Sequence, residues 1–367
     1  LEPLSPPLRL LLGPGPSEVA PEVLEALSRP LIGHLDPAFL KLMDGIMEGL
    51  RVLFRTRNRL TLPISGTGSA GMETAISNLV EADDRVVVAI CGYFGARMAE
   101  MCRRRGAKIV TVEAPWGGPV DPADVVRAVA AGPTKAVCIV HAETSTGVLQ
   151  PLEGIADAVH EAGGFLIADT VTSLGGVPLD VDATGIDAAY SGSQKCLSAP
   201  PGASPFTISE RAMEAVRTRR TPVPFWYLDL TLLNRYFDAG DRVYHHTAPI
   251  SNFYALHEAI RLALDEGLEA RWRRHAAAGA ALAEGAAALG LDLLVDPRWR
   301  LGVLTTIKVP AGVDEKEIRR RLLAEEGIEI AGGLGPLAGK VWRVGLMGHG
   351  ARIENVERLL AALRRLL

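Results

Sequence analysis

The sequence lacks the features of a membrane protein, a nucleic-acid-binding protein and a disulfide-stabilised protein. Its apolar runs are shorter than the roughly 18 residues that a membrane-spanning helix needs. A formal net charge of -4 supplies no excess of basic residues for nucleic acid. Only 4 cysteines occur in 367 residues, and none has the CxxC or Cys/His spacing of a metal site. We therefore expect a cytoplasmic globular protein, with two domains at this length.

Lysine is also scarce, with 7 residues against 32 arginines. Only Lys195 follows an apolar, strand-like stretch, has small residues beside it and lacks a charged neighbour. A lysine that is removed from water in this way has a lowered pKa and can act as a nucleophilic amine or form a Schiff base. The alternative is a lysine whose aliphatic part lies along the protein while its amine reaches solvent.

Short apolar runs rich in β-branched residues alternate with helical patterns between residues 60 and 210. The predicted strands are 60–65, 85–91, 109–113, 136–141, 165–169, 188–191 and 204–208. Such alternation is typical of an α/β fold with a parallel sheet that binds its ligand at the carboxyl ends of the strands. Upstream we expect a short helix through Val23, capped by Ser17, and an amphipathic helix that starts near Phe39.

The last third of the chain has a different pattern. It is mostly helical and rich in alanine up to Leu289 and then changes to a smaller α/β unit. The predicted strands of that unit are 292–295, 303–309 and 341–346, and its predicted helices are 314–325 and 353–366. We predict an N-terminal arm of residues 1–20, a large domain of residues 21–250 and a small C-terminal domain of residues 251–367.

The segment 65–71, Ser-Gly-Thr-Gly-Ser-Ala-Gly, follows a predicted strand and opens a helix. Amide groups at a helix N-terminus, together with hydroxyl groups, bind phosphate well. The glycines also match the dinucleotide fingerprint G-x-G-x-x-G, which needs an acidic residue at the end of the next strand. That strand ends in Cys91-Gly92-Tyr93 instead. A single phosphate is therefore favoured over a dinucleotide, and a purely structural turn stays open.

Three further side chains suit a flat, charged cofactor or its substrate. Asp169 ends an apolar strand, where a carboxylate is costly unless a cation such as a protonated pyridine nitrogen pairs with it; a cap or a metal ligand is the alternative. Phe94 could stack on a heterocycle or belong to the core. Arg343 could bind a carboxylate through two hydrogen bonds or lie on the surface. The adjacent His245 and His246 point in different directions, which argues against a metal site.

Together these segments resemble the class V aminotransferases, which have the fold type I architecture of pyridoxal-phosphate enzymes, and above all their alanine–glyoxylate (serine–pyruvate) aminotransferase branch. The most specific runs are 191–195, Ser-Gly-Ser-Gln-Lys, and 145–152, Ser-Thr-Gly-Val-Leu-Gln-Pro-Leu. The resemblance implies a mostly parallel seven-stranded sheet in a large domain and a smaller C-terminal α/β domain. It also implies transamination of alanine or serine, with glyoxylate or pyruvate as the amino acceptor.

The resemblance implies roles for individual residues. Lys195 corresponds to the Schiff-base lysine, Asp169 to the acid on the pyridine nitrogen and Arg343 to the arginine that binds the substrate carboxylate. The remaining positions that correspond to cofactor contacts within one subunit are Thr67, Gly68, Ser69, Phe94, Thr144 and Gln194. Tyr244 and Thr247 correspond to phosphate contacts from a neighbouring subunit, so the resemblance implies a homodimer with shared active sites.

Two positions depart from this branch and two other activities stay open. Phe94 stands where tryptophan is common, and Ser69 stands where histidine can occur. The (S)-ureidoglycine–glyoxylate aminotransferases share the same pattern, including the loop at residues 33–36. A nicotinamide-dependent oxidoreductase, which the segment 65–71 alone supports, is the remoter alternative.

Overall fold

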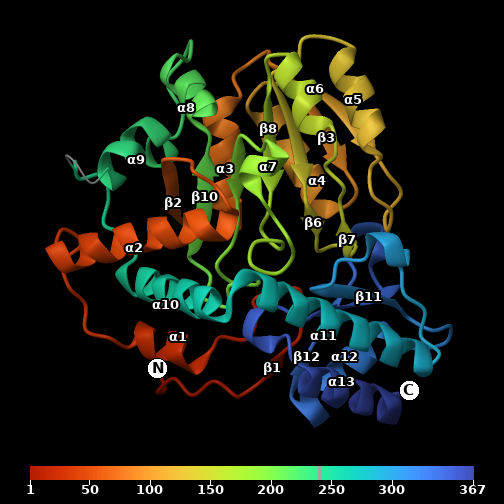
Figure 1. The fold of residues 1–367 in the computed structure, drawn as a ribbon. Coiled ribbons are helices and arrows are strands. Elements are labelled where there is room, and N and C mark those ends of the chain that lie inside the picture. Colours follow the sequence, from red (N-terminus) through yellow and green to blue (C-terminus); the bar gives the residue numbers. More distant parts are fainter. Residues whose placement is uncertain (239–241) are drawn as a thin grey trace.

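A seven-stranded sheet occupies the centre of the computed structural model, which describes residues 1–238 and 242–367 (Figure 1). Its strands are β2 (Leu60–Ser65), β3 (Arg85–Ile90), β4 (Lys108–Glu113), β5 (Ala136–Val140), β8 (Phe165–Asp169), β9 (Ala188–Tyr190) and β10 (Ala203–Ile208). Their order in space is β2-β10-β9-β8-β5-β3-β4. Strand β10 is antiparallel to both of its neighbours, and the other adjacent pairs are parallel. All seven predicted strands are present, and each end lies within one residue of its predicted place.

Helices cover this sheet (Figure 1). They are α2 (Pro37–Phe54), α3 (Gly68–Leu79), α4 (Tyr93–Arg104), α5 (Pro122–Ala130), α6 (Ile155–Glu161), α7 (Val181–Thr184), α8 (Glu210–Arg217) and α9 (Leu230–Phe237). The first helix, α1 (Pro21–Leu27), lies away from the sheet against α10 (Ile250–Glu266), and a small hairpin of β6 (Ala142–Glu143) and β7 (Val148–Leu149) lies beyond β5. The predicted amphipathic helix is α2, which buries Phe39, Met43 and Ile46 along one side. Asp36 fixes its start because its carboxylate accepts a hydrogen bond of 2.8 Å from the amide of Ala38.

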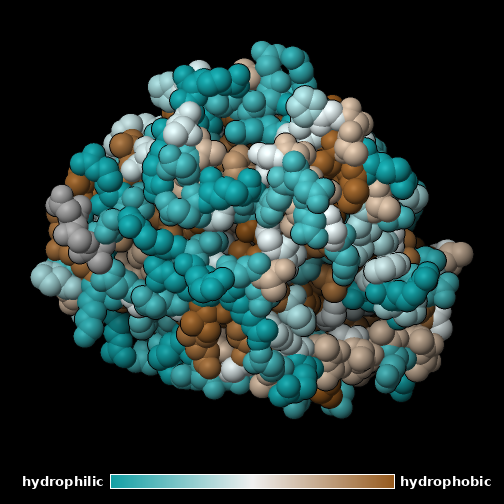
Figure 2. All heavy atoms as spheres, turned by 45° about the horizontal axis from the view of Figure 1, so that its top comes forward, coloured by the Kyte–Doolittle hydropathy of each residue, from teal (hydrophilic) through white to brown (hydrophobic). Residues whose placement is uncertain are grey.

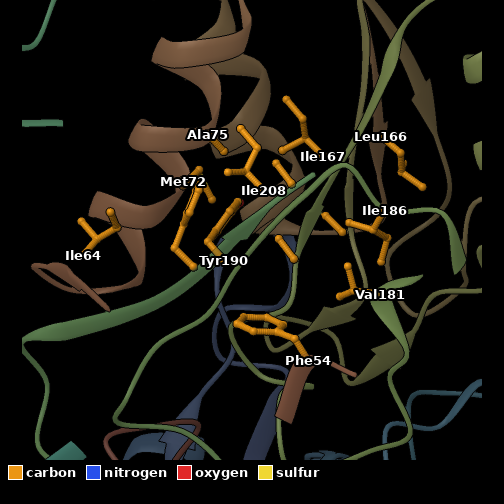
Figure 3. Packing of buried hydrophobic residues seen from close by; sticks show 14 of the residues in the cluster. Phe54, Ile64, Met72, Ala75, Leu166, Ile167, Val181, Ile186, Tyr190 and Ile208 are labelled. Atoms are coloured by element: carbon orange, nitrogen blue, oxygen red, sulfur yellow. The ribbon is translucent and has the colours of Figure 1, made fainter. Parts of the chain in front are cut away.

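The middle of the sheet is closed to water. Every residue of β5 and β8 is buried, as is typical of parallel strands that helices cover. Figure 3 shows Met72 and Ala75 of α3 packed in the same cluster as Tyr190 of β9 and Ile208 of β10. Burying one large aliphatic side chain contributes about 1.5–3 kcal/mol. This packing holds the carboxyl ends of the central strands in fixed positions.

The C-terminal part of the chain forms a second α/β unit. Helix α10 still packs on the large unit, because Phe253 and Leu256 belong to the hydrophobic cluster of the large sheet. The elements of the second unit are α11 (Leu268–Ala288), β11 (Leu304–Lys308), α12 (Glu315–Glu326), β12 (Ile328–Glu329), β13 (Ala331–Gly332), β14 (Val341–Gly345) and α13 (Ile353–Leu366). Strands β11, β14 and β13 form an antiparallel sheet in that order. Trp342 and Val344 of β14 belong to a second hydrophobic cluster with Leu282, Ile307 and Leu359. The domain boundaries at residues 20 and 250 stay a prediction.

The strand predicted at residues 292–295 is wrong. Within this segment, which the structure describes, Leu293 makes only an isolated antiparallel bridge with Ile307. Asp296 then begins a 3-10 turn at Pro297–Trp299, where its carboxylate accepts a hydrogen bond from the amide of Arg298. This turn carries the chain away from β11, so the pairing ends after one bridge.

The N-terminal arm connects the two units. Its strand β1 (Leu10–Leu11) pairs in parallel with β12 of the C-terminal unit, and Figure 1 shows the arm passing from there beneath α10. The predicted cap of α1 by Ser17 is wrong, because Ala20 is the N-cap residue of that helix. The hydroxyl of Ser17 donates instead to the carbonyl oxygen of Lys195 at 2.7 Å, and its amide donates to that of Gln194 at 2.9 Å.

The face of the molecule in Figure 2 carries limited hydrophobic areas. The rest of this face is largely hydrophilic. The exposed large hydrophobic side chains include three aromatic ones, Trp226, Tyr227 and Tyr244. In the described part of the chain, no helix is long and apolar enough to cross a membrane.

The close contact between α3 and the sheet predicts opposite outcomes for two helical glycines. A Cβ atom at Gly71 would overlap the hydroxyl of Ser204 and lie 2.8 Å from Cβ of Tyr190. Gly71→Ala should therefore lower the free energy of unfolding by about 1–3 kcal/mol. Gly45 in α2 has room, with His257 3.5 Å away, so Gly45→Ala should raise it by up to about 1 kcal/mol. Denaturant unfolding measures both changes, and a stabilised Gly71→Ala variant would contradict the packing described.

Candidate active site

A cavity lies at the carboxyl ends of the central strands. The register of the sheet pairs Val140 of β5 with Asp169 of β8, and Asp169 with Tyr190 of β9, so these three strands end at one level. The cavity has a volume of about 250 Å³. The predicted site residues that line it are Thr67, Gly68, Ser69, Phe94, Thr144, Asp169, Gln194 and Lys195. Residues from five separate segments of the chain are therefore brought together at the predicted edge of the sheet.

Asp169 is held at the base of this cavity. Its carboxylate accepts a hydrogen bond of 2.8 Å from the amide of Val171 and one of 3.0 Å from the hydroxyl of Tyr190. Burial nevertheless raises the pKa of this carboxyl to about 7, because both hydrogen bonds together do not replace the lost solvation of the charge. A cation placed beside Asp169 would favour its ionised form.

Lys195 faces the same cavity from the loop after β9. Its amine donates a hydrogen bond to the carbonyl oxygen of Pro14 in the N-terminal arm. Burial lowers the pKa of this amine to about 8, so a substantial fraction is neutral near physiological pH. The arm passes so close that a Cβ atom at Gly15 would lie 2.7 Å from Nζ. The amine is thus held within the protein, where it can act as a nucleophile.

The glycine-rich segment forms the side of the cavity that suits a phosphate. Helix α3 begins at Gly68, and within the described residues the side chain of its N-cap residue, Thr67, makes no capping hydrogen bond. The amides of a first helical turn have no partners inside the helix, and they carry the positive end of the helix dipole. Gln194 lies on the same cavity, and its buried Oε1 has no partner among the residues that the structure describes. A phosphate group would accept hydrogen bonds from the amides of this first turn and from the side-chain Nε2 of Gln194.

The structure also shows the positions of Phe94, predicted to stack on a cofactor ring, and Arg343, predicted to bind a carboxylate. Phe94 lines the cavity from the first turn of α4. Arg343 is buried, and its guanidinium donates to the carbonyl oxygens of Thr144 at 3.1 Å and Gly332 at 2.8 Å. The alternative of a surface arginine is therefore wrong. Arg343 lies directly behind a residue that lines the cavity.

Tyr244 and Thr247 do not line this cavity in a single chain. Both side chains are exposed, with Tyr244 at 57%. The ring of Tyr244 contacts only the ring of His34 among its described aromatic neighbours, at 5.3 Å between centroids. The structure therefore leaves both side chains available at the surface.

Glu143 was not among the predicted site residues, although it is fully buried beside the cavity. Its carboxylate accepts hydrogen bonds from the amides of Phe94 at 3.1 Å and Gly95 at 3.3 Å, and from the hydroxyl of Ser145 at 2.6 Å. It thereby occupies the N-terminus of α4, the helix that carries Phe94. Burial raises the pKa of Glu143. Its place directly before Thr144, after a strand end, was the available sequence signal.

Arg97 was also missed. Its guanidinium donates to the hydroxyl of Ser69 at 3.2 Å and lies 4.8 Å from the centre of the Phe94 ring. The spacing of three residues from Phe94 along a helix would have placed both side chains on one face. Arg97 thus adds a positive charge to the wall of the cavity.

A larger cavity, of about 570 Å³, lies elsewhere between the sheet and the C-terminal unit. Arg55, Asp157 and Trp299 are among its lining residues. In the part of the chain that the structure describes, it contains none of the predicted site residues. It is therefore not the candidate active site.

The sheet, with a lysine and an acid at its carboxyl edge, defines an enzyme that binds a charged aromatic cofactor. A family model described as aminotransferase class V matches residues 10–359. The chain belongs to this family, whose members depend on pyridoxal phosphate, and it has their fold type I architecture.

Relatives of known name cover the whole chain. An (S)-ureidoglycine–glyoxylate transaminase of Bacillus subtilis (strain 168) is 41% identical over 382 residues, which cover 99% of this chain and 92% of the relative. An alanine–glyoxylate aminotransferase of Rattus norvegicus is 43% identical over 369 residues, with coverage of 100% and 89%. The crystal structure of an alanine–glyoxylate aminotransferase from Nostoc sp. has a TM-score of 0.98 and 52% identity, with coverage of 100% and 97%.

The residues of the cavity fit pyridoxal phosphate. The side-chain amide nitrogen of Gln194 and the open N-terminus of α3 are hydrogen-bond donors that suit the phosphate, as far as the described residues show. The carboxylate of Asp169 suits a protonated ring nitrogen, and the amine of Lys195 suits the aldehyde. Each functional group of the cofactor therefore has a complementary side chain on one cavity.

The raised pKa of Asp169 predicts a stability that depends on pH in the protein without cofactor. The folded state binds this proton more tightly than the unfolded chain, where the ordinary value is 3.8. Unfolding therefore releases a proton between about pH 4 and pH 7, and the free energy of unfolding falls as the pH rises through this window. Asp169→Asn should raise stability by up to about 4 kcal/mol at pH 8 and change it little at pH 4.

Thermal unfolding of the cofactor-free protein at several pH values measures this difference. Asp182→Asn is the matched control, because hydrogen bonds from Thr56 and Arg57 outweigh partial burial and lower the pKa of Asp182. That variant should be destabilised at pH 8. An Asp169→Asn variant that is less stable than the unmodified protein at pH 8 would contradict the prediction.

Proposed function

We propose that this protein transfers the amino group of a small amino acid, alanine or serine, to glyoxylate or pyruvate. The observation that carries the proposal is the placement of Lys195 and Asp169 on one cavity, with Arg343 directly behind Thr144. The names of the relatives at 41% and 43% identity both include glyoxylate. These findings support an acceptor of that kind.

Pyridoxal phosphate supplies an aldehyde that condenses with amines and a ring that takes up the electron pair left when the Cα–H bond of the substrate breaks. Lys195 is proposed to hold the aldehyde and, once an amino acid displaces it, to move the proton from Cα as general base and then general acid. Its pKa of about 8 suits both roles near neutral pH. Asp169 is proposed to keep the proton on the ring nitrogen, which its buried carboxylate favours by pairing with it.

The remaining residues are proposed to position the cofactor and substrate. Phe94 would stack on the ring, and Thr144 would contact its edge. The phosphate would be bound by Thr67, Gly68, Ser69 and Gln194, which all line the cavity. Arg343 would bind the substrate carboxylate through its guanidinium fork. A cavity of about 250 Å³ that must accept both cofactor and substrate favours a substrate with a small side chain.

We also propose a homodimer in the cytoplasm, with active sites shared between subunits. Tyr244 and Thr247 are exposed in one chain and stand apart from its own cavity. Trp226 and Tyr227, exposed at 60% and 43%, lie in the segment that packs against His245 and His246. Exposed aromatic side chains of this kind are enriched in protein interfaces. In the dimer, Tyr244 and Thr247 would reach the phosphate of the neighbouring site.

Ureidoglycine is the second candidate donor. The Bacillus subtilis relative named for this substrate matches 99% of the chain at 41% identity, close to the 43% of the alanine–glyoxylate enzyme. Arg97 on the cavity wall is a hydrogen-bond donor that could serve a polar donor substrate.

Steady-state assays of alanine, serine and ureidoglycine with glyoxylate distinguish these donors. We expect the largest kcat/KM with alanine or serine. Lys195→Ala is the inactive reference and should lose both turnover and the visible absorbance of covalently bound cofactor. Normal activity in that variant would refute the role of the lysine, and a preference for ureidoglycine by tenfold or more would refute the proposed donor.

Arg343→Ala should weaken the binding of amino acid and oxo acid alike. Removing one partner of a buried, hydrogen-bonded ion pair costs about 2–5 kcal/mol, so KM should rise by roughly 100-fold for both substrates. The absorbance of the bound cofactor should not change. Arg320→Ala, which removes an exposed arginine paired with Glu317, is the control. Equal KM values in the two variants would remove Arg343 from the carboxylate site.

A further inference from the structure

A chain of four hydrogen-bonding groups runs from the surface to the start of the phosphate segment. The carbonyl oxygen of Trp226 lies 3.3 Å from Nε2 of His245, whose Nδ1 lies 2.8 Å from Nδ1 of His246. Nε2 of His246 lies 2.7 Å from the hydroxyl of Ser65. Both histidines are buried. No group of metal-binding side chains occurs at this place or elsewhere in residues 1–238 and 242–367.

The direction of every hydrogen bond in this chain follows from its first acceptor. A carbonyl oxygen only accepts, so Nε2 of His245 carries a hydrogen. In a neutral imidazole the other nitrogen then accepts, so Nδ1 of His246 must donate to it. Nε2 of His246 is left as an acceptor and receives the hydrogen of the Ser65 hydroxyl. Each donor and acceptor is thus satisfied once, and His246 has the less common tautomer with its hydrogen on Nδ1.

The surroundings favour the neutral form of both rings. The ring of Trp226 stacks on His245 with centroids 4.1 Å apart, and the rings of Tyr227 and Tyr236 lie 4.9 Å and 5.5 Å from that of His246. Burial lowers the pKa of both histidines, to about 4 for His246. A positive charge on either ring would also face a second donor across the 2.8 Å contact.

We propose that this hydrogen-bond chain fixes the position of the segment 244–247 relative to the cofactor cradle, the segment 65–69 that begins the proposed phosphate site. Ser65 is the last residue of β2 and directly precedes Gly66 and Thr67, while Thr247 directly follows His246. The inference rests on the proposed function, in which Tyr244 and Thr247 bind the phosphate held by the neighbouring subunit. One set of hydrogen bonds then sets the distance between the cradle of a subunit and the side chains that it offers to its partner.

The tautomers test the geometry in the unmodified holoenzyme. Nitrogen-15 NMR of protein labelled at histidine, with His245→Asn and His246→Asn for assignment, distinguishes the three forms of each imidazole. We expect a neutral His245 with its hydrogen on Nε2 and a neutral His246 with its hydrogen on Nδ1. A cationic ring, or a hydrogen on Nε2 of His246, would overturn the proposed series of hydrogen bonds.

Cofactor affinity tests the positioning role. The side-chain amide of asparagine can replace Nδ1 of His246 but does not reach Ser65, whereas that of glutamine can reach Ser65. His246→Asn and Ser65→Ala should each weaken pyridoxal phosphate binding roughly tenfold, and shift the phosphorus NMR signal of the bound phosphate. His246→Gln should stay close to the unmodified protein. The double variant Ser65→Ala/His246→Asn should be no weaker than either single variant, because both remove the same contact.

His257→Gln is the control. It changes a half-buried histidine of α10 that takes no part in the hydrogen-bond chain, and this variant should bind pyridoxal phosphate normally. Unchanged affinity in His246→Asn, or equal losses in the asparagine and glutamine variants, would overturn the positioning role. Failure of the proposed shared site is distinguishable, because the unmodified protein would then be a monomer in solution while still binding pyridoxal phosphate.

Discussion

The buried carboxylate of Asp169 is the constraint on which the rest of the site depends. It ends the central strand β8, where every residue is shielded from water, and only the amide of Val171 and the hydroxyl of Tyr190 contact it through hydrogen bonds in the described structure. Two such bonds leave a charged carboxylate poorly solvated, which is why its pKa rises to about 7. A site of this kind binds a cation strongly, because the cation supplies the missing compensation. The sheet thus favours a cofactor with a protonated ring nitrogen.

Further buried charges surround Asp169 and are held in place by backbone groups. Glu143 is bound by the amides of Phe94 and Gly95, and Arg343 is bound by the carbonyl of Thr144. The short hairpin β6–β7 therefore connects the ring wall of the cavity with the proposed carboxylate site. A shift of this hairpin would therefore disturb the contacts of both Phe94 and Arg343, the proposed ring and carboxylate contacts.

The sequence predicted the large sheet well because its strands are continuous apolar runs bounded by turns, a local pattern that burial on both faces requires. It also predicted most of the cavity, since the carboxyl ends of parallel strands meet at one edge. Ser17 shows the limit of local reasoning. Serine is a common helix N-cap residue, but the hydroxyl of Ser17 donates a hydrogen bond to the carbonyl oxygen of Lys195, about 180 residues away. The segment 292–295 failed because a following turn, and not its own residues, ended the pairing.

For other parts of the site the local pattern gave a position but not the contacts. Glu143 acts through hydrogen bonds to amides about fifty residues earlier in the chain, and no spacing rule joins these positions. Arg97 needed the exact start of α4, which fixes the face that Phe94 and Arg97 share. Tyr244 and Thr247 lie at the surface of the single chain, so their proposed contact with a neighbouring site could not be tested there.

The N-terminal arm has a consequence for the geometry of the reaction. The amide of Gly345, at the end of the strand that carries Arg343, donates to Leu12 at 2.8 Å, and five residues later Ser17 binds the backbone of Lys195. This short span fixes the separation between the strand of Arg343 and the backbone of Lys195. If the proposed roles of these two residues hold, its length in residues limits how far the carboxylate of an amino acid can lie from the atom that loses its proton, and with it the size of the substrate.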